Sequence, residues 1–187
     1  MVRRSSFLAA VAACATVPGI VAAKPRPRQS PGPHVHGANG VVVLPEGRPL
    51  EWESEVLDGP RFRLSAYRGK VVFINLFATW CPPCNTEQPD LVAFARAHPD
   101  DTAVIGMDIA EFDDTVRKYR KRYDIPYPIA MDRSGRATRG LFSEIAGLPM
   151  TLVIRPDGIL SCAWSDDKDR AWFEDERLAA LESVPRD

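Results

Sequence analysis

The sequence is poor in cysteine and has no excess of charge of one sign. Its 187 residues include four cysteines, 24 Lys and Arg, and 25 Asp and Glu, for a formal net charge of −1. Four cysteines are too few for a disulfide scaffold, and interspersed charges of both signs create no field that attracts nucleic acid. Both classes are therefore disfavoured. With 45% hydrophobic residues, the chain has the composition of a globular protein of one domain plus a leader and a linker.

The first 23 residues have the layout of a signal peptide. Arg3 and Arg4 precede an apolar run over residues 7–17, and the small residues 21–23 suit a cleavage site. As a membrane-spanning helix the segment is short and is interrupted by Pro18-Gly19, so cleavage is favoured over a retained membrane anchor. Cys14 follows Val-Ala-Ala as in a lipobox, which keeps lipidation open as a third alternative. We therefore expect an extracytoplasmic protein, in the periplasm or cell envelope, with the leader as a tether if it is retained.

The composition of residues 24–40 predicts a flexible linker, because this segment is rich in Pro, Gly and basic side chains. His34 and His36 lie in this linker without further ligands nearby, so we predict no metal site there. The folded domain is expected to occupy residues 41–187.

Alternating segments in this domain predict an α/β fold with a central mixed sheet flanked by helices. Strands are expected at residues 41–44, 71–77, 103–107, 127–131, 151–154 and 159–163, with extended chain up to residue 64. Helices are expected at residues 82–97, 113–122, 136–142 and 169–183. In the last helix Trp172, Phe173, Leu178 and Leu181 have spacings that suit one face packed on the sheet.

A C-x-x-C motif, Trp80-Cys81-Pro82-Pro83-Cys84, follows a buried strand and opens a helix, which is the context of a redox dithiol. The helix N-terminus stabilises a thiolate, so Cys81 is the predicted nucleophile. Cys84 lies one turn later, within bonding reach, and is the predicted resolving thiol. Pro82 and Pro83 suit the first helical turn. A zinc site is disfavoured because the sequence has no second C-x-x-C or H-x-x-x-H motif, and we predict neither a metal nor a cofactor.

Two separated motifs make the chain from about residue 52 to 184 resemble thioredoxin-like proteins of the TlpA/ResA family. The stretch GKVVFINLFATWC, residues 69–81, resembles that family's approach to the active site, and GLPMT, residues 147–151, resembles its cis-proline loop. The resemblance implies a thioredoxin-like fold and thiol-disulfide oxidoreductase activity. It also implies that substrate is contacted around the dithiol, by Trp80, Pro82, Pro83, Leu148 and Pro149. Plain hydrophobic packing is the alternative role for Trp80.

The same resemblance bears on proton transfer and on substrate choice. Glu87, three residues after Cys84, matches an acidic residue that assists proton transfer in this family. Asn75 falls where thioredoxin carries a buried aspartate, so Glu87 is the expected assisting carboxylate. Without the resemblance, Glu87 is equally well explained as a first-turn acid favoured by the helix dipole. Met150 follows the proline where other family members carry Thr or Glu, which leaves the substrate open.

The favoured function is a reductase of envelope protein disulfides, supplied with electrons by a membrane thiol protein. The family resemblance implies apocytochrome c as a substrate during haem attachment. Two alternatives stay open: an oxidant that donates its disulfide, and a Cu(I)-binding chaperone of related fold that uses the two thiolates. A peroxidase is disfavoured, because a peroxidatic cysteine does not need a resolving partner three residues away.

Overall fold

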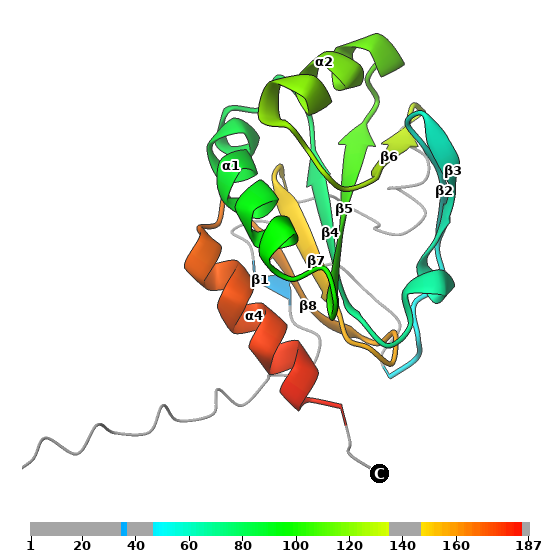
Figure 1. Ribbon diagram of the computed structural model, residues 1–187, viewed down its shortest axis with the longest axis vertical. Helices are drawn as coiled ribbons and strands as arrows, with labels where there is room; N and C mark the ends of the chain where they lie inside the picture. Colours follow the sequence, from blue (N-terminus) through cyan, green and yellow to red (C-terminus); the bar gives the residue numbers. More distant parts are fainter. Residues whose placement is uncertain (1–34, 37–46, 135–146, 185–187) are drawn as a thin grey trace, which may run out of the picture.

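The computed structural model describes residues 35–36, 47–134 and 147–184 (Figure 1). The leader, the strand predicted at residues 41–44 and the helix predicted at residues 136–142 lie outside the described residues. Within the described part of the chain, none of the helices is both long and apolar enough to cross a membrane.

One mixed sheet of eight strands forms the centre of the described domain, in the order β1-β8-β7-β4-β5-β6-β2-β3. The central strand β4 pairs in parallel with β5 and antiparallel with β7. This arrangement confirms the predicted α/β class and mixed sheet. The strands are β1 (Val35–His36), β2 (Glu53–Val56), β3 (Gly59–Arg63), β4 (Val71–Phe77), β5 (Thr102–Ile109), β6 (Ile129–Asp132), β7 (Met150–Ile154) and β8 (Leu160–Ser165).

Three α-helices among the described residues pack on one face of the sheet: α1 (Pro82–Ala97), α2 (Asp113–Tyr123) and α4 (Arg170–Glu182). Helices α1 and α4 lie side by side over the sheet, and α2 lies near the end of β5 (Figure 1). Residues before β4, including the short 3-10 helix η1 (Leu64–Tyr67), supply apolar side chains to the opposite face. In the described residues, the predicted flanking by helices therefore holds for one face.

Strand β4 is buried along its whole length, as expected for a strand covered on both faces. Its side chains alternate between two apolar layers. Phe73 and Phe77 belong to the layer under the helices, whereas Ile74 and Leu76 belong to the opposite layer. Asn75 shares the face of Phe73 and Phe77, which places an amide group among apolar side chains beneath α1.

The predicted bounds of β4 and α1 are confirmed, and three other predictions need correction. The extended chain expected up to residue 64 is divided by a β2-β3 turn, where Asp58 has a φ of 55°. Within the predicted linker, Val35–His36 forms a short strand parallel to β8. In α4, Phe173 is buried but Leu178 is 51% exposed, so the prediction for Leu178 is wrong. At 3.6 residues per turn, Leu178 lies roughly 140° around the helix from Phe173.

Candidate active site

The Cys81–Cys84 pair forms a disulfide at the point where the loop after β4 enters α1. The two Cα atoms are 5.3 Å apart. Cys81 is the N-cap residue of α1, and its Sγ accepts a hydrogen bond from the Cys84 N–H at 3.3 Å. The predicted bonding reach between the two sulfurs is confirmed, and both cysteines are buried.

The start of α1 is electrostatically suited to a thiolate. Pro82 and Pro83 occupy its first positions, where a missing N–H costs little, and the first turn holds no acidic side chain. The positive end of the helix dipole therefore acts on the Cys81 sulfur without an opposing carboxylate in that turn. In the reduced protein, this placement favours ionisation of Cys81.

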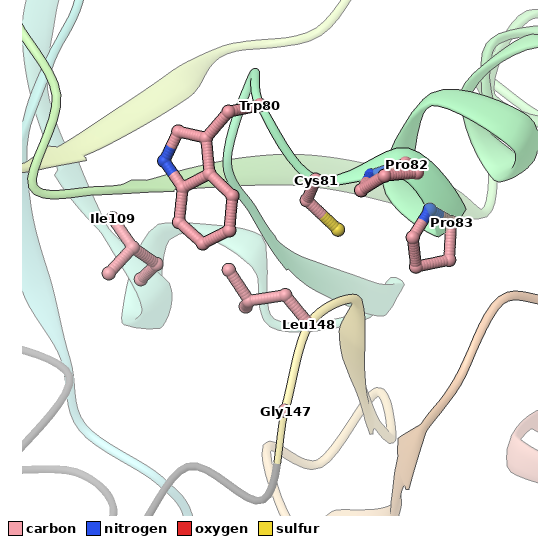
Figure 2. A pocket seen from close by; sticks show the side chains of 7 residues that line it. All are labelled: Trp80, Cys81, Pro82, Pro83, Ile109, Gly147 and Leu148. Carbon is pink, nitrogen blue, oxygen red and sulfur yellow. The ribbon is translucent and has the colours of Figure 1, made fainter.

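An open apolar pocket of about 460 Å³ adjoins the disulfide. Figure 2 shows the Cys81 sulfur facing the space between Pro83 and Leu148, with the Trp80 ring on the other side of Leu148, near Ile109. Trp80 is 70% exposed, so plain core packing does not explain it. Gly147 and Pro82 complete the lining. The structure thus brings the Trp80 segment and the loop before β7 to one surface, whereas Pro149, also a predicted substrate contact, is buried and does not line the pocket.

The loop before β7 contains a cis peptide bond between Leu148 and Pro149. The Pro149 carbonyl accepts a hydrogen bond from the Asp166 N–H at 3.1 Å. Leu148 lines the pocket, but Met150 is fully buried in the layer on the face opposite the helices. The unusual residue after the proline therefore packs in the core, and Leu148 rather than Met150 presents a side chain to the pocket.

Glu87 is a buried carboxylate on the inward side of α1. Its Oε1 accepts a hydrogen bond from Asn75 Nδ2 at 2.6 Å, and its Oε2 accepts one from the Lys168 N–H at 2.8 Å. Asn75 Nδ2 also donates to Thr151 Oγ1 at 3.0 Å, across the β4-β7 pair in which these two residues are directly opposite. Glu87 is not among the first-turn residues of α1. The alternative explanation of Glu87 as a first-turn acid favoured by the helix dipole is therefore wrong.

Burial is the largest influence on the pKa of Glu87 and on the pKa of its basic neighbour, Lys168. Removal from water raises the pKa of Glu87 to about 7. The charge of Lys168 and the hydrogen bonds that Glu87 accepts from Lys168 and Asn75 act in the opposite direction. Burial likewise lowers the pKa of Lys168, opposed by Glu87. A carboxyl group with a pKa near neutrality is suited to accept and return a proton at physiological pH.

A second acidic network, which the sequence did not reveal, holds the loop that precedes Trp80. Glu111 accepts hydrogen bonds from the Thr79 N–H at 2.5 Å and the Thr79 hydroxyl at 2.6 Å. The Glu111 N–H donates to Oδ1 of Asp108 at 3.1 Å, while Asp108 Oδ2 is buried without a partner. Burial, and then the Glu111 carboxyl, raise the pKa of Asp108 to about 8. In sequence, these acids looked like ordinary residues at the end of a strand.

Cys162 lies apart from this chemistry, on β8. It is half-buried, and its Sγ donates a hydrogen bond to Glu176 Oε2 at 3.4 Å. Burial and the nearby Glu176 carboxylate raise the pKa of its thiol, which makes the thiolate scarce at neutral pH. This environment is that of a structural cysteine rather than of a redox nucleophile.

The chain matches a known protein family over more than half of its length. Residues 49–163 match the AhpC/TSA family. The chain belongs to the AhpC/TSA family. The match spans the sheet from before β2 to within β8 and contains the dithiol and the cis-proline loop.

Curated relatives agree with this assignment. The thiol-disulfide oxidoreductase ResA of Bacillus thuringiensis subsp. konkukian (strain 97-27) is 31% identical over 103 residues, which are 54% of this chain and 58% of that protein. The ResA of Geobacillus kaustophilus (strain HTA426) is also 31% identical, with the same coverage of 54% and 58%. The match thus spans a little over half the length of these relatives.

Solved structures agree on the fold. A thiol:disulfide interchange protein of the thioredoxin family from Chlorobium tepidum TLS is 28% identical, with a TM-score of 0.64 over 77% of this chain and 100% of that one. A secreted disulfide oxidoreductase of Mycobacterium tuberculosis has the same fold at 21% identity, with a TM-score of 0.61 over 70% of this chain and 96% of that one. The predicted thioredoxin-like fold and the resemblance to thiol-disulfide oxidoreductases are confirmed.

Proposed function

We propose that this protein is an exported thiol-disulfide oxidoreductase that reduces disulfides of proteins in the cell envelope. One observation carries the proposal: the Cys81–Cys84 disulfide lies at the N-terminus of α1, beside an open apolar pocket. A helix N-terminus lowers the pKa of a thiol, and the pocket admits a polypeptide to the sulfur. The similarity to ResA proteins, which are named thiol-disulfide oxidoreductases, supports the same reaction.

The proposed reaction begins with the reduced protein. The Cys81 thiolate attacks one sulfur of a substrate disulfide, forms a mixed disulfide, and releases the other substrate sulfur as a thiolate. Cys84 then loses its proton and attacks the Cys81 sulfur, which forms the Cys81–Cys84 disulfide and releases the second substrate sulfur. Two electrons pass to the substrate, whose two thiolates take up protons. The oxidised protein must then be reduced by another thiol protein, and we propose a membrane-bound donor.

Glu87 is the proposed acceptor for the Cys84 proton. The two residues are three positions apart on α1, so their side chains lie on the same side of the helix, and both are buried. Attack by Cys84 requires its thiolate, which burial disfavours unless a base is close. A Glu87 pKa of about 7 allows the carboxylate to accept this proton at neutral pH.

The proposed substrates are protein disulfides with an apolar side chain close to the cysteine. Trp80, Ile109 and Leu148 give the pocket an apolar lining that fits such a side chain. Apocytochrome c, which carries a C-x-x-C-H motif, is the substrate that the TlpA/ResA resemblance implies. The proposed extracytoplasmic location rests on the signal-peptide layout of residues 1–23.

A direct test uses a peptide that contains a C-x-x-C-H disulfide. The reduced protein should reduce this peptide stoichiometrically, and Cys84→Ser should accumulate a mixed disulfide through Cys81. Cys81→Ser is the control, and should form no such adduct. If wild-type protein and Cys84→Ser both leave the peptide and a second, unrelated protein disulfide intact, the proposed function is wrong.

A further inference from the structure

We propose that Lys168 is a positioning residue that fixes the Glu87 carboxyl and favours its ionised form. The proposal rests on the proposed function, because its consequence is the pH at which Cys84 gives up its proton. Lys168 lies between β8 and α4, far in sequence from the dithiol, and in the sequence it is an ordinary lysine among aspartates.

Lys168 contacts Glu87 twice. Its backbone N–H donates to Glu87 Oε2 at 2.8 Å, and its Nζ lies 3.6 Å from the same oxygen. The two side chains are only 2% and 1% exposed, so water does little to screen the pair. Burial of either charge alone is costly, which makes each partner the main compensation for the other.

Two further groups hold the ammonium in place. Lys168 Nζ donates a hydrogen bond to the Asp166 carbonyl oxygen and lies 5.4 Å from the centre of the Trp172 ring. A cation at this distance from an indole face is stabilised by the ring. Lys168 is therefore held by the loop before α4 and by α4 itself, while Glu87 is held by α1 and by Asn75 of β4.

The charge environment of the pair is mainly acidic or neutral. Asn75 of β4 donates a hydrogen bond to Glu87. The charge of Glu87 also acts on the hydroxyls of Tyr119 in α2 and Tyr127 in the chain before β6. Facing Lys168 are the carboxylates of Asp166 and Asp167, and the Cys162 thiol of β8 with its partner Glu176 of α4. None of these groups supplies a positive charge. Lys168 is thus the cation that offsets the charge of Glu87.

The chemical consequence concerns one proton. When the mixed disulfide is resolved, the proton leaves the Cys84 thiol for a Glu87 oxygen, and no oxidant or reductant beyond the substrate disulfide is involved. Lys168 stabilises the carboxylate form of Glu87 and so keeps it available as an acceptor near neutral pH. Without the ammonium, burial acts unopposed by this charge, and Glu87 stays protonated to higher pH.

The experiment compares Lys168→Met with Lys118→Met, an exposed lysine of α2, in the full chain. Two quantities are measured against pH: the rate at which Cys84 resolves a mixed disulfide of Cys81 with a small aromatic thiol, and the carbon-13 shift of the Glu87 carboxyl. For Lys168→Met, both midpoints should move upward by about one pH unit or more, with resolution about tenfold slower below the midpoint. Lys118→Met should match the wild type.

Lys168→Arg and Lys168→Gln separate charge from packing. The arginine variant should keep the wild-type midpoints, whereas the glutamine variant should shift in the direction of Lys168→Met. Equal shifts in both variants, or no shift of the Glu87 carboxyl in Lys168→Met and Lys168→Gln, would overturn the proposal. The carboxyl titration needs no turnover, so it tests Lys168 even if the wild type fails to reduce any disulfide. A wild type that reduces no disulfide would overturn the proposed function but not the proposed role of Lys168.

Discussion

Asn75 of β4 and Glu87 of α1 are joined by a buried hydrogen bond of 2.6 Å between the amide nitrogen and a carboxylate oxygen. The sheet thus presents a neutral donor to the helix, and the helix supplies the acid. A neutral amide supports the carboxylate without a second negative charge in the same buried space. The same amide nitrogen also donates to Thr151, so Asn75 of β4 links β7 to Glu87 of α1.

Glu87→Gln should slow resolution of the mixed disulfide but leave the first attack by Cys81 almost unchanged. A general base contributes about 10²- to 10⁴-fold, so we expect a loss of at least about 10²-fold at pH 7.5 and no inflection near pH 7. Rapid mixing with tryptophan fluorescence from Trp80, next to Cys81, follows both steps. Glu182→Gln, at the exposed end of α4, is the matched control. Unchanged resolution in Glu87→Gln would remove Glu87 from the mechanism.

Asn75→Asp should raise the pKa of Glu87, since it places a second carboxyl group 2.6 Å from the first. Two carboxyl groups this close do not both ionise readily, so they should titrate as a coupled pair with one step well above pH 7. Carbon-13 shifts of the two carboxyls against pH measure this. Asn85→Asp is the control, because Asn85 lies between the Thr79 carbonyl and the Tyr123 hydroxyl instead. A Glu87 midpoint that stays near 7 in Asn75→Asp would contradict the described geometry.

Trp80→Ala should weaken substrate binding with little change in stability. Trp80 is 70% exposed, so its loss should change the unfolding free energy by no more than about 0.5 kcal/mol. Loss of an aromatic residue at an interface commonly costs more than about 1 kcal/mol, so KM for a protein disulfide should rise about fivefold or more. Phe112→Ala is a stringent control: Phe112 is even more exposed, at 85%, but does not line the pocket. Equal effects of the two variants would argue against a specific role for the pocket.

Asp108→Asn should gain stability relative to the wild type as the pH rises. The pKa of Asp108 in the folded protein, about 8, lies above the ordinary value of 3.8. The folded protein therefore keeps a proton that the unfolded chain releases between these pH values, and the wild type loses stability across this window. Asparagine does not ionise, so the variant should gain stability relative to the wild type between pH 4 and pH 8, by at most about 1.4 kcal/mol per pH unit.

Urea unfolding of both proteins at pH 4, 6 and 8 measures this difference. Asp114→Asn, the same substitution at an exposed position of α2, is measured alongside as the control. A pH-independent difference between Asp108→Asn and the wild type would mean that Asp108 is ionised in the folded protein at neutral pH.

The fold and the dithiol were accessible from sequence because their signals are local. The apolar run of β4 and the prolines at the start of α1 predict these elements with the bounds that the structure has. The cysteine spacing and the helix start then predict the disulfide without tertiary information. The boundaries of β5 and β6 were less accurate, since polar residues such as Asp108 and Asp132 lie at their buried ends.

The partners of Glu87 and Thr79 depend on contacts between distant segments. Lys168 reaches Glu87 over 81 positions, and Glu111 reaches Thr79 over 32. Neither residue has a neighbour in sequence that distinguishes it from a solvated charge. The predicted burial of Leu178 was wrong for a related reason. The spacing of a few apolar residues fits more than one helical face, and only the neighbouring elements decide which face is buried.

The reduction potential of the Cys81/Cys84 couple tests the central claim most directly. The purified protein is equilibrated in glutathione buffers, the fraction of disulfide is measured at each ratio, and Cys81→Ser is the control. A reductase requires one reversible two-electron couple well below the value of about −180 mV typical of protein disulfide isomerase, and absent from Cys81→Ser. A potential near about −120 mV would make the protein a disulfide donor, and the absence of a reversible disulfide would contradict a redox function altogether.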